Sequence, residues 1–225
     1  MTRSRLGFGI MRLPRKNNKV DMEKAEKLIL SAINQGVNYF DTAYMYFGTE
    51  QALGEILEKH NKRSEVNIAT KIPPYLLKSK TDFDKYFKIQ TQRLKTDYLD
   101  YYMLHMVTDA ATVERILSLG LSDWVTKMKS EGKIKNFGFS YHGNTDEYKK
   151  VIDKFPWDFS MIQYNLIDEN SQAGRRGMEY AYEKGIPVFV MEPLRGGRII
   201  TDMPKEIVAE VKKTGHTMAE FGLRW

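Results

Sequence analysis

Residues 21–41 read DMEKAEKLILSAINQGVNYFD, and this stretch contains the pattern that the rest of the chain repeats. Residues 22–35 carry apolar side chains at the spacing of one helix face, and Asp21 stands where a helix N-cap belongs. Gly36 follows at the position where many helices end in a left-handed residue. The apolar run 37–40 then predicts a strand. This stretch therefore predicts a helix, a short connection and a strand.

The same alternation of apolar runs and longer amphipathic segments continues along the chain. Strands are predicted at 6–11, 37–40, 66–70, 99–104, 134–139, 159–163 and 186–191. Helices are predicted at 22–35, 51–60, 83–94, 112–130, 146–154 and 177–184, and glycines end several of them. Strands that alternate with single helices are typical of βαβ units and a parallel sheet.

The uninterrupted alternation favours an α/β fold of the (β/α)8 TIM-barrel type, with residues 1–225 forming a single domain. An open doubly wound sheet is the alternative, but Gly7-Phe8-Gly9 lacks the third glycine of the dinucleotide-binding fingerprint. Residues 217–225 resemble the start of a helix that would lead into an eighth strand. We therefore expect the barrel to be truncated before its eighth strand, as in a fragment or a shortened variant.

The composition of the 225 residues is that of a globular protein, with 42% hydrophobic and 28% charged residues. Cysteine is absent, which excludes disulfides, thiolate metal sites and cysteine nucleophiles. No apolar run approaches the roughly 20 residues of a membrane helix, and no signal peptide is recognisable, so a cytoplasmic protein is expected. The 35 basic and 29 acidic residues are scattered, which argues against nucleic acid as a partner.

Polar side chains stand at the carboxyl ends of three consecutive predicted strands: Asp41 and Tyr46, then Lys71, then His105. In a parallel barrel these ends meet at one mouth, where chemistry takes place. A buried Lys71 ammonium needs a counter-ion, which Asp41 can provide. A cation beside Tyr46 stabilises its phenolate form and makes the phenol a usable general acid, while His105 can orient a substrate oxygen. This set suggests reduction of a carbonyl group, with hydride supplied by a cofactor.

Several separated motifs resemble those of the aldo-keto reductase family and occur in the family's order. They are Phe40-Asp41-Thr42-Ala43-Tyr44-Met45-Tyr46 with Gly48 and Glu50, Ala69-Thr70-Lys71, Tyr98 to His105, Gly138-Phe139-Ser140 and Gln163-Tyr164-Asn165. The resemblance runs from Leu6 nearly to the last residue. The segments around Ser140 and Met191 resemble a bacterial and archaeal subset whose longer members often carry a C-terminal ferredoxin-like segment.

The resemblance implies a reductase of aldehydes or ketones that uses NADPH, with NADH also possible, and takes a small carbonyl compound as substrate. The implied catalytic residues are Asp41, Tyr46, Lys71 and His105, with Tyr46 as the proton donor. The implied cofactor-binding residues are Ser140, Gln163, Met191, Leu194, Gly196 and Gly197. An iron–sulfur cluster would belong only to a C-terminal segment that this sequence does not contain.

Two departures from the family pattern concern the nicotinamide. Ser140 is followed by Tyr141 where many members have asparagine, and Met191 stands where many have a tyrosine that stacks on the ring. A thioether can still pack against the ring, although with a less defined geometry.

Three other interpretations compete with a working reductase. A barrel hydrolase would use four metal-competent residues, Asp41, His105, His142 and Glu192, but it would leave the tyrosine and the lysine unexplained. A cofactor-binding regulatory module would need the same cofactor site without turnover. An inactive, truncated barrel would expose unpaired strand edges and aggregate.

Overall fold

The computed structural model describes residues 3–225, and its main sheet has seven strands in the order β1-β4-β5-β6-β7-β8-β9. The strands are β1 (Phe8–Gly9), β4 (Tyr39–Asp41), β5 (Asn67–Ile72), β6 (Leu99–Val107), β7 (Ile134–Tyr141), β8 (Phe159–Gln163) and β9 (Val188–Met191). The strands of this sheet follow one another in sequence order, with the hairpin residues 15–20 between β1 and β4, and the pairs β1–β4, β4–β5, β5–β6 and β8–β9 are parallel. This order lacks the reversal that defines a doubly wound sheet. The α/β class and the parallel pairing are confirmed.

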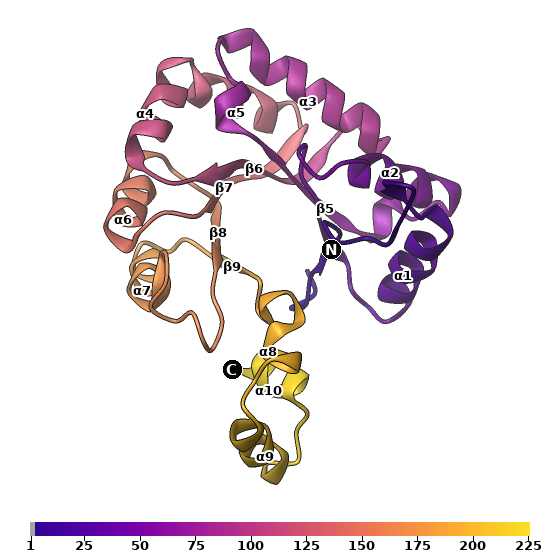
Figure 1. Ribbon diagram of the computed structural model, residues 1–225. Coiled ribbons are helices and arrows are strands. Elements are labelled where there is room, and N and C mark those ends of the chain that lie inside the picture. Colours follow the sequence, from indigo (N-terminus) through magenta and orange to yellow (C-terminus); the bar gives the residue numbers. More distant parts are fainter. Residues whose placement is uncertain (1–2) are drawn as a thin grey trace. The chain divides into compact units, whose positions relative to one another are not determined.

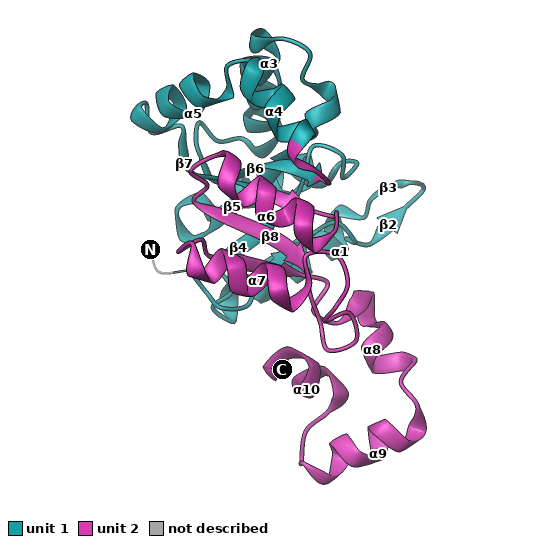
Figure 2. Ribbon diagram, turned by 90° about the vertical axis from the view of Figure 1, so that its left-hand side faces the viewer, with its two compact units in different colours: residues 1–106, 111–139 teal, residues 107–110, 140–225 magenta. Residues whose placement is uncertain are grey.

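The chain divides into two compact units, coloured separately in Figure 2. Unit 1 comprises residues up to 106 together with 111–139. Its helices are α1 (Met22–Asn34), α2 (Thr49–Lys59), α3 (Lys80–Leu94), α4 (Ala110–Ser118) and α5 (Leu121–Ser130). Helices α1, α2 and α3 lie on the outer side of the strands (Figure 1), and buried side chains such as Leu53, Ile68 and Tyr102 fill the space between them.

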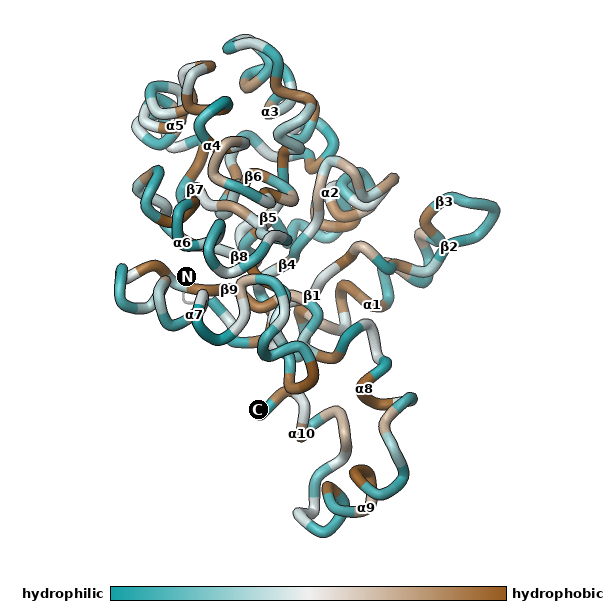
Figure 3. Tube along the Cα trace, turned by 60° about the vertical axis from the view of Figure 1, so that its left-hand side comes forward, coloured by the Kyte–Doolittle hydropathy of each residue, from teal (hydrophilic) through white to brown (hydrophobic). Residues whose placement is uncertain are grey.

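Unit 2 comprises residues 107–110 and 140–225. It contains β8 and β9, the helices α6 (Thr145–Lys154) and α7 (Gly174–Glu183), the short 3₁₀ turn η3 (Arg195–Gly197), and the helices α8 (Arg198–Thr201), α9 (Lys205–Lys213) and α10 (Met218–Arg224). The last three helices share a small apolar cluster built on Ile199, Val211 and Met218. Hydrophilic and hydrophobic residues alternate along these helices (Figure 3), as they do in amphipathic helices that pack on one face.

Local signals in the opening stretch are present as expected. The Asp21 side chain accepts a hydrogen bond from the Lys24 N–H at 3.2 Å and so caps α1. Gly36 has a left-handed φ of 86° directly after the helix. The register of β4 and β5 pairs Asp41 with Ala69, and that of β5 and β6 pairs Lys71 with Met103. The ends of these strands therefore place the predicted polar side chains at one edge of the unit 1 sheet.

Other expectations need correction. The single helix predicted at 112–130 is two helices, because Gly120 adopts a left-handed φ of 93° between α4 and α5 and interrupts the helical path. A small antiparallel hairpin, β2 (Arg15–Lys16) and β3 (Lys19–Val20), was not predicted, and neither were α8 and α9. Strand β1 is also shorter than the predicted run at 6–11.

Among residues 3–225, no helix has both the length and the apolar character needed to cross a membrane.

Candidate active site

The centre of the candidate site is an ion pair between adjacent strands of unit 1. The Lys71 ammonium on β5 donates to Asp41 Oδ1 at 2.5 Å and to the Thr42 carbonyl at 2.8 Å, and only 2% of the Lys71 side chain is exposed. Burial raises the pKa of the Asp41 carboxyl, while the charge of Lys71 and its hydrogen bond act in the opposite direction. The predicted counter-ion is therefore in place.

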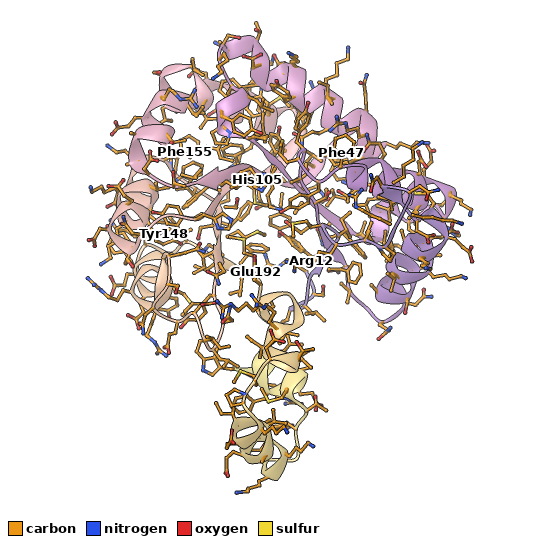
Figure 4. All side chains as sticks on the ribbon, viewed as in Figure 1. Arg12, Phe47, His105, Tyr148, Phe155 and Glu192 are labelled. Atoms are coloured by element: carbon orange, nitrogen blue, oxygen red, sulfur yellow. The ribbon has the colours of Figure 1, made fainter. Side chains whose placement is uncertain are left out.

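Tyr46 and His105 lie beside this pair. The Lys71 ammonium is 4.9 Å from the centre of the Tyr46 ring, and the Tyr46 and His105 rings meet edge to face at 5.6 Å between centroids. His105, labelled in Figure 4, is 7% exposed and stands near the end of β6. Met106 follows it with a left-handed φ of 56°, so the strand backbone is irregular directly after the histidine. The structure thus brings together the four residues predicted as catalytic.

The turn that carries Tyr46 is held by its neighbours in the sequence. The Tyr46 carbonyl accepts from the Thr49 N–H at 3.1 Å and from the Thr49 hydroxyl at 2.8 Å. The Thr49 hydroxyl also lies 2.7 Å from that of Thr42, the residue whose carbonyl binds Lys71. The start of α2 and the end of β4 are therefore tied together around the tyrosine.

A second buried carboxylate supports the lysine strand from the side of the helices. Glu50, 1% exposed, accepts from the Thr70 hydroxyl at 2.6 Å, from Gln90 Nε2 at 2.7 Å and from Arg93 Nη1 at 3.1 Å. Gln90 Nε2 also donates to the Lys71 carbonyl at 3.1 Å. Burial raises the pKa of Glu50, although these three hydrogen bonds act to lower it. Glu50 thus connects α2, α3 and β5 behind the site.

Ser140 lies at the end of β7 and is 1% exposed. The next residue, Tyr141, is fully buried, and its hydroxyl donates to the Asn144 carbonyl at 2.7 Å, with the Thr108 carbonyl at 3.1 Å. Gly143 belongs to the same turn, because a Cβ at this position would lie 1.9 Å from the Thr108 carbonyl oxygen. The Tyr141 hydroxyl is therefore hydrogen-bonded to the local backbone, at the position where many family members have asparagine.

Gln163 and Met191 are register partners on β8 and β9, so the structure places these two predicted nicotinamide contacts side by side. Gln163 is 8% exposed, and both ends of its amide are hydrogen-bonded. Its Nε2 donates to Asp168 Oδ2 at 2.7 Å, and its Oε1 accepts from Gln172 Nε2 at 2.7 Å. The amide of Gln163, which is predicted to bind the cofactor, is thus held in one orientation by two neighbours.

The segment after β9 contains the remaining predicted cofactor residues. Gly196 and Gly197 have left-handed φ values of 67° and 96°. The Gly197 N–H donates to the Leu194 carbonyl at 2.9 Å. The Leu194 side chain packs on the apolar cluster of the last helices. Arg195 Nε lies 3.4 Å from Asp168 Oδ2.

Within residues 3–225, no group of three or more histidine, aspartate or glutamate side chains is arranged to hold a metal ion. Among the four residues considered as metal ligands, Asp41 is already hydrogen-bonded to the Lys71 ammonium. The carbonyl of Glu192 accepts from Asn165 Nδ2 at 3.2 Å.

Sequence reasoning missed Asp168 and Gln172. Both lie in the loop between β8 and α7, outside every quoted motif. One local signal was available: Asn165 stands three residues before Asp168, and its side-chain oxygen accepts from the Asp168 N–H at 3.0 Å, as asparagine does in turns. The link to Gln163 depends on the path of the loop, which the spacing alone does not give.

A buried lysine–carboxylate pair beside a tyrosine and a histidine, at the ends of parallel strands, is an arrangement that can support proton transfer. Residues 5–220 match the sequence profile of the Aldo/keto reductase family, and the chain belongs to that family. The resemblance seen in the motifs is confirmed, and with it the oxidoreductase class of function.

Three relatives illustrate the similarity. Methylglyoxal reductase YeaE of Escherichia coli is 27% identical over 215 residues, which cover 90% of this chain and 70% of that protein. The holo form of an aldo-keto reductase from Bacillus halodurans has a TM-score of 0.71 and 27% identity, covering 89% of this chain and 66% of the other. An aldo/keto reductase from Klebsiella pneumoniae, solved with NADP and acetate, has a TM-score of 0.75 at 23% identity, covering 97% and 75%. This chain therefore spans about two thirds to three quarters of their lengths.

Proposed function

We propose that this chain reduces an aldehyde or ketone to the alcohol, with Tyr46 as the general acid. The observation that carries the proposal is the position of the Lys71 ammonium, 4.9 Å from the Tyr46 ring and bound to Asp41 at 2.5 Å. The family of the chain and its similarity to a methylglyoxal reductase support a carbonyl substrate.

Each residue of the site has a part in the proton transfer. The Tyr46 hydroxyl gives its proton to the carbonyl oxygen, and the nearby ammonium stabilises the phenolate that remains. Asp41 holds Lys71 in this position and balances its charge inside the protein. The His105 ring, edge-on to Tyr46, is the group that orients the substrate oxygen by a hydrogen bond.

NADPH is the proposed cofactor, with NADH as the alternative, and when bound it supplies the hydride that no side chain can provide. Ser140, Gln163 and Met191 would hold the nicotinamide end. Gly196 and Gly197, with the Leu194 backbone, would face the pyrophosphate. The donor set fits, because the Gln163 amide keeps one N–H and one oxygen lone pair beyond its bonds to Asp168 and Gln172.

Within the α/β class, we propose that the fold is of the (β/α)8 barrel type. Its support is the sequential strand order, which a barrel requires, and the likeness to solved family members. In barrels of this type the carboxyl ends of the strands carry the catalytic residues.

The test is Tyr46→Phe, which removes only the phenolic oxygen. Oxidation of NADPH, followed by its absorbance with methylglyoxal as acceptor, is expected to slow by about 10²- to 10⁴-fold, the usual worth of a general acid. Binding of NADPH, measured by fluorescence, is expected to persist.

Tyr182→Phe is the matched control, because Tyr182 is 83% exposed and far from the site in sequence. Its rate of NADPH oxidation should equal that of the parent protein. A Tyr46→Phe variant that keeps the parent rate would contradict the assigned role of the phenol.

A further inference from the structure

Asp168 gathers three donors on one carboxylate oxygen in unit 2. Its Oδ2 accepts from Gln163 Nε2 at 2.7 Å and from Asn165 Nδ2 at 3.0 Å, and Arg195 Nε lies at 3.4 Å. The residue is only 8% exposed. The position of Asp168 is itself fixed, because its N–H donates to Asn165 Oδ1 at 3.0 Å. A buried carboxylate is thus held at the end of β8 by groups from both sides of the loop.

This carboxylate decides which way the Gln163 amide points. An ionised carboxylate only accepts hydrogen bonds, so it binds the NH₂ end of an amide and repels the oxygen end. Gln172 acts on the other end, since its Nε2 donates to Gln163 Oε1 at 2.7 Å. A flipped Gln163 would place its oxygen against the carboxylate and its NH₂ group against another NH₂ group. Only one orientation of the amide satisfies both neighbours.

In that orientation Gln163 keeps one free donor position on nitrogen and one free lone pair on oxygen. A primary carboxamide, which also carries one NH₂ group and one oxygen, is the complement of this pair. The cost of burying the charge of Asp168 is offset by Arg195, which lies in the segment that follows β9.

We propose that Asp168 is a positioning residue of the cofactor site, which fixes the Gln163 amide in the orientation that receives the nicotinamide carboxamide. This inference rests on the proposed use of a nicotinamide cofactor. Asp168 acts through Gln163, with Arg195 as its counter-ion and Gln172 as the second constraint on the amide.

The main variant is Asp168→Asn, which keeps the shape of the side chain but presents an amide that donates as well as accepts. The Gln163 amide can then adopt two orientations. Chains that hold the flipped orientation cannot form the hydrogen bonds to the nicotinamide carboxamide. The dissociation constant for NADPH, measured by fluorescence titration of the whole chain, is expected to rise about twofold, because with two equally populated orientations half of the chains hold the wrong one. Asp153→Asn is the control: Asp153 forms an ion pair with Lys184 on the surface of the same unit, and its replacement should leave NADPH binding unchanged.

A double variant separates positioning from a general structural role. Gln163→Ala alone should weaken NADPH binding, and Asp168→Asn added to it should cause no further loss, because the residue through which Asp168 acts is absent. If Asp168→Asn does not fold, as judged by thermal unfolding, Gln172→Met replaces it and is expected to raise the dissociation constant by up to about twofold, because it removes the other constraint on the amide.

Two results would overturn the proposal. In the first, Asp168→Asn binds NADPH as tightly as the parent chain. In the second, it weakens binding equally with and without Gln163. If the parent chain binds neither NADPH nor NADH, the proposed function itself fails and this inference fails with it, so the two failures are distinguishable.

Discussion

The Lys71 ammonium is almost completely enclosed, yet two acceptors lie within hydrogen-bond distance of it. A charge removed from water costs several kcal/mol unless a partner and hydrogen bonds compensate for it. Asp41 and the Thr42 carbonyl supply that compensation, and both come from the strand end and turn that carry Tyr46. Holding the cation beside the phenol is therefore built into the same short stretch of sequence as the phenol itself.

The buried Glu50 carboxyl, which lies behind Lys71, makes the free energy of unfolding depend on pH. Because burial raises the pKa of Glu50 above 4.5, the folded chain binds this proton more tightly than the unfolded chain does. The stabilisation is present at low pH and is lost as pH rises from 4.5 through the raised value. The free energy of unfolding, relative to Glu50→Gln, should fall by about 1.4 kcal/mol for each unit by which the pKa is raised.

Urea unfolding of the parent chain and of Glu50→Gln at a series of pH values between 4 and 8 checks this expectation. The difference between the two free energies should shrink or change sign in favour of the variant as pH rises. A difference that stays constant, or that grows in favour of the parent chain, would show that the hydrogen bonds from Thr70, Gln90 and Arg93 outweigh burial.

At the scale of single elements, the turn after β7 depends on Gly143. A Cβ there would lie 1.9 Å from the Thr108 carbonyl oxygen and 2.4 Å from the Tyr141 hydroxyl. Gly143→Ala must displace one of them, and we expect it to lower the free energy of unfolding by about 2–3 kcal/mol, as overpacking does.

Gly9→Ala provides the comparison, because a Cβ at Gly9 meets no atom within 4 Å. Its effect on the free energy of unfolding should stay within about 1 kcal/mol, the usual cost or gain of this exchange. Equal midpoints of thermal unfolding for the two variants would argue that the turn can open without penalty.

Regular elements could be predicted wherever one pattern dominated the local sequence. The helix at 22–35 had a cap, an apolar face and a terminal glycine, and α1 follows it closely. The helix predicted at 112–130 failed because its apolar spacing continued through Gly120, and the spacing does not show that this glycine is left-handed. The hairpin β2–β3 has two residues in each strand, too few for any alternation to be recognised.

The contacts of the candidate site also divide into those that could be predicted from the sequence and those that could not. The pairing of Asp41 with Lys71 could be predicted because both stand at the carboxyl ends of neighbouring strands in one parallel sheet. The neighbours of Gln163 could not, because Asp168 and Gln172 reach it through a loop, and a loop path follows from packing and not from a repeat in the sequence. Sequence patterns therefore named the candidate residues but not the groups that form hydrogen bonds with them.

For the whole molecule, the family assignment covers residues 5–220 and so includes both units. The residues proposed for proton transfer, Asp41, Tyr46, Lys71 and His105, all belong to unit 1, whereas the proposed cofactor residues belong to unit 2. Reduction of a carbonyl group would need both sets, one for the proton and the other to hold the source of hydride. We propose that this chain performs both steps on one substrate.

The most direct measurement is transfer of an isotopic label. The chain is incubated with methylglyoxal and NADPH that carries deuterium on the transferable position of C4, and the alcohol is analysed by mass spectrometry and NMR. We expect deuterium on the former carbonyl carbon and a solvent-derived hydrogen on its oxygen. Alcohol without deuterium on that carbon, or oxidation of NADPH without formation of alcohol, would contradict it.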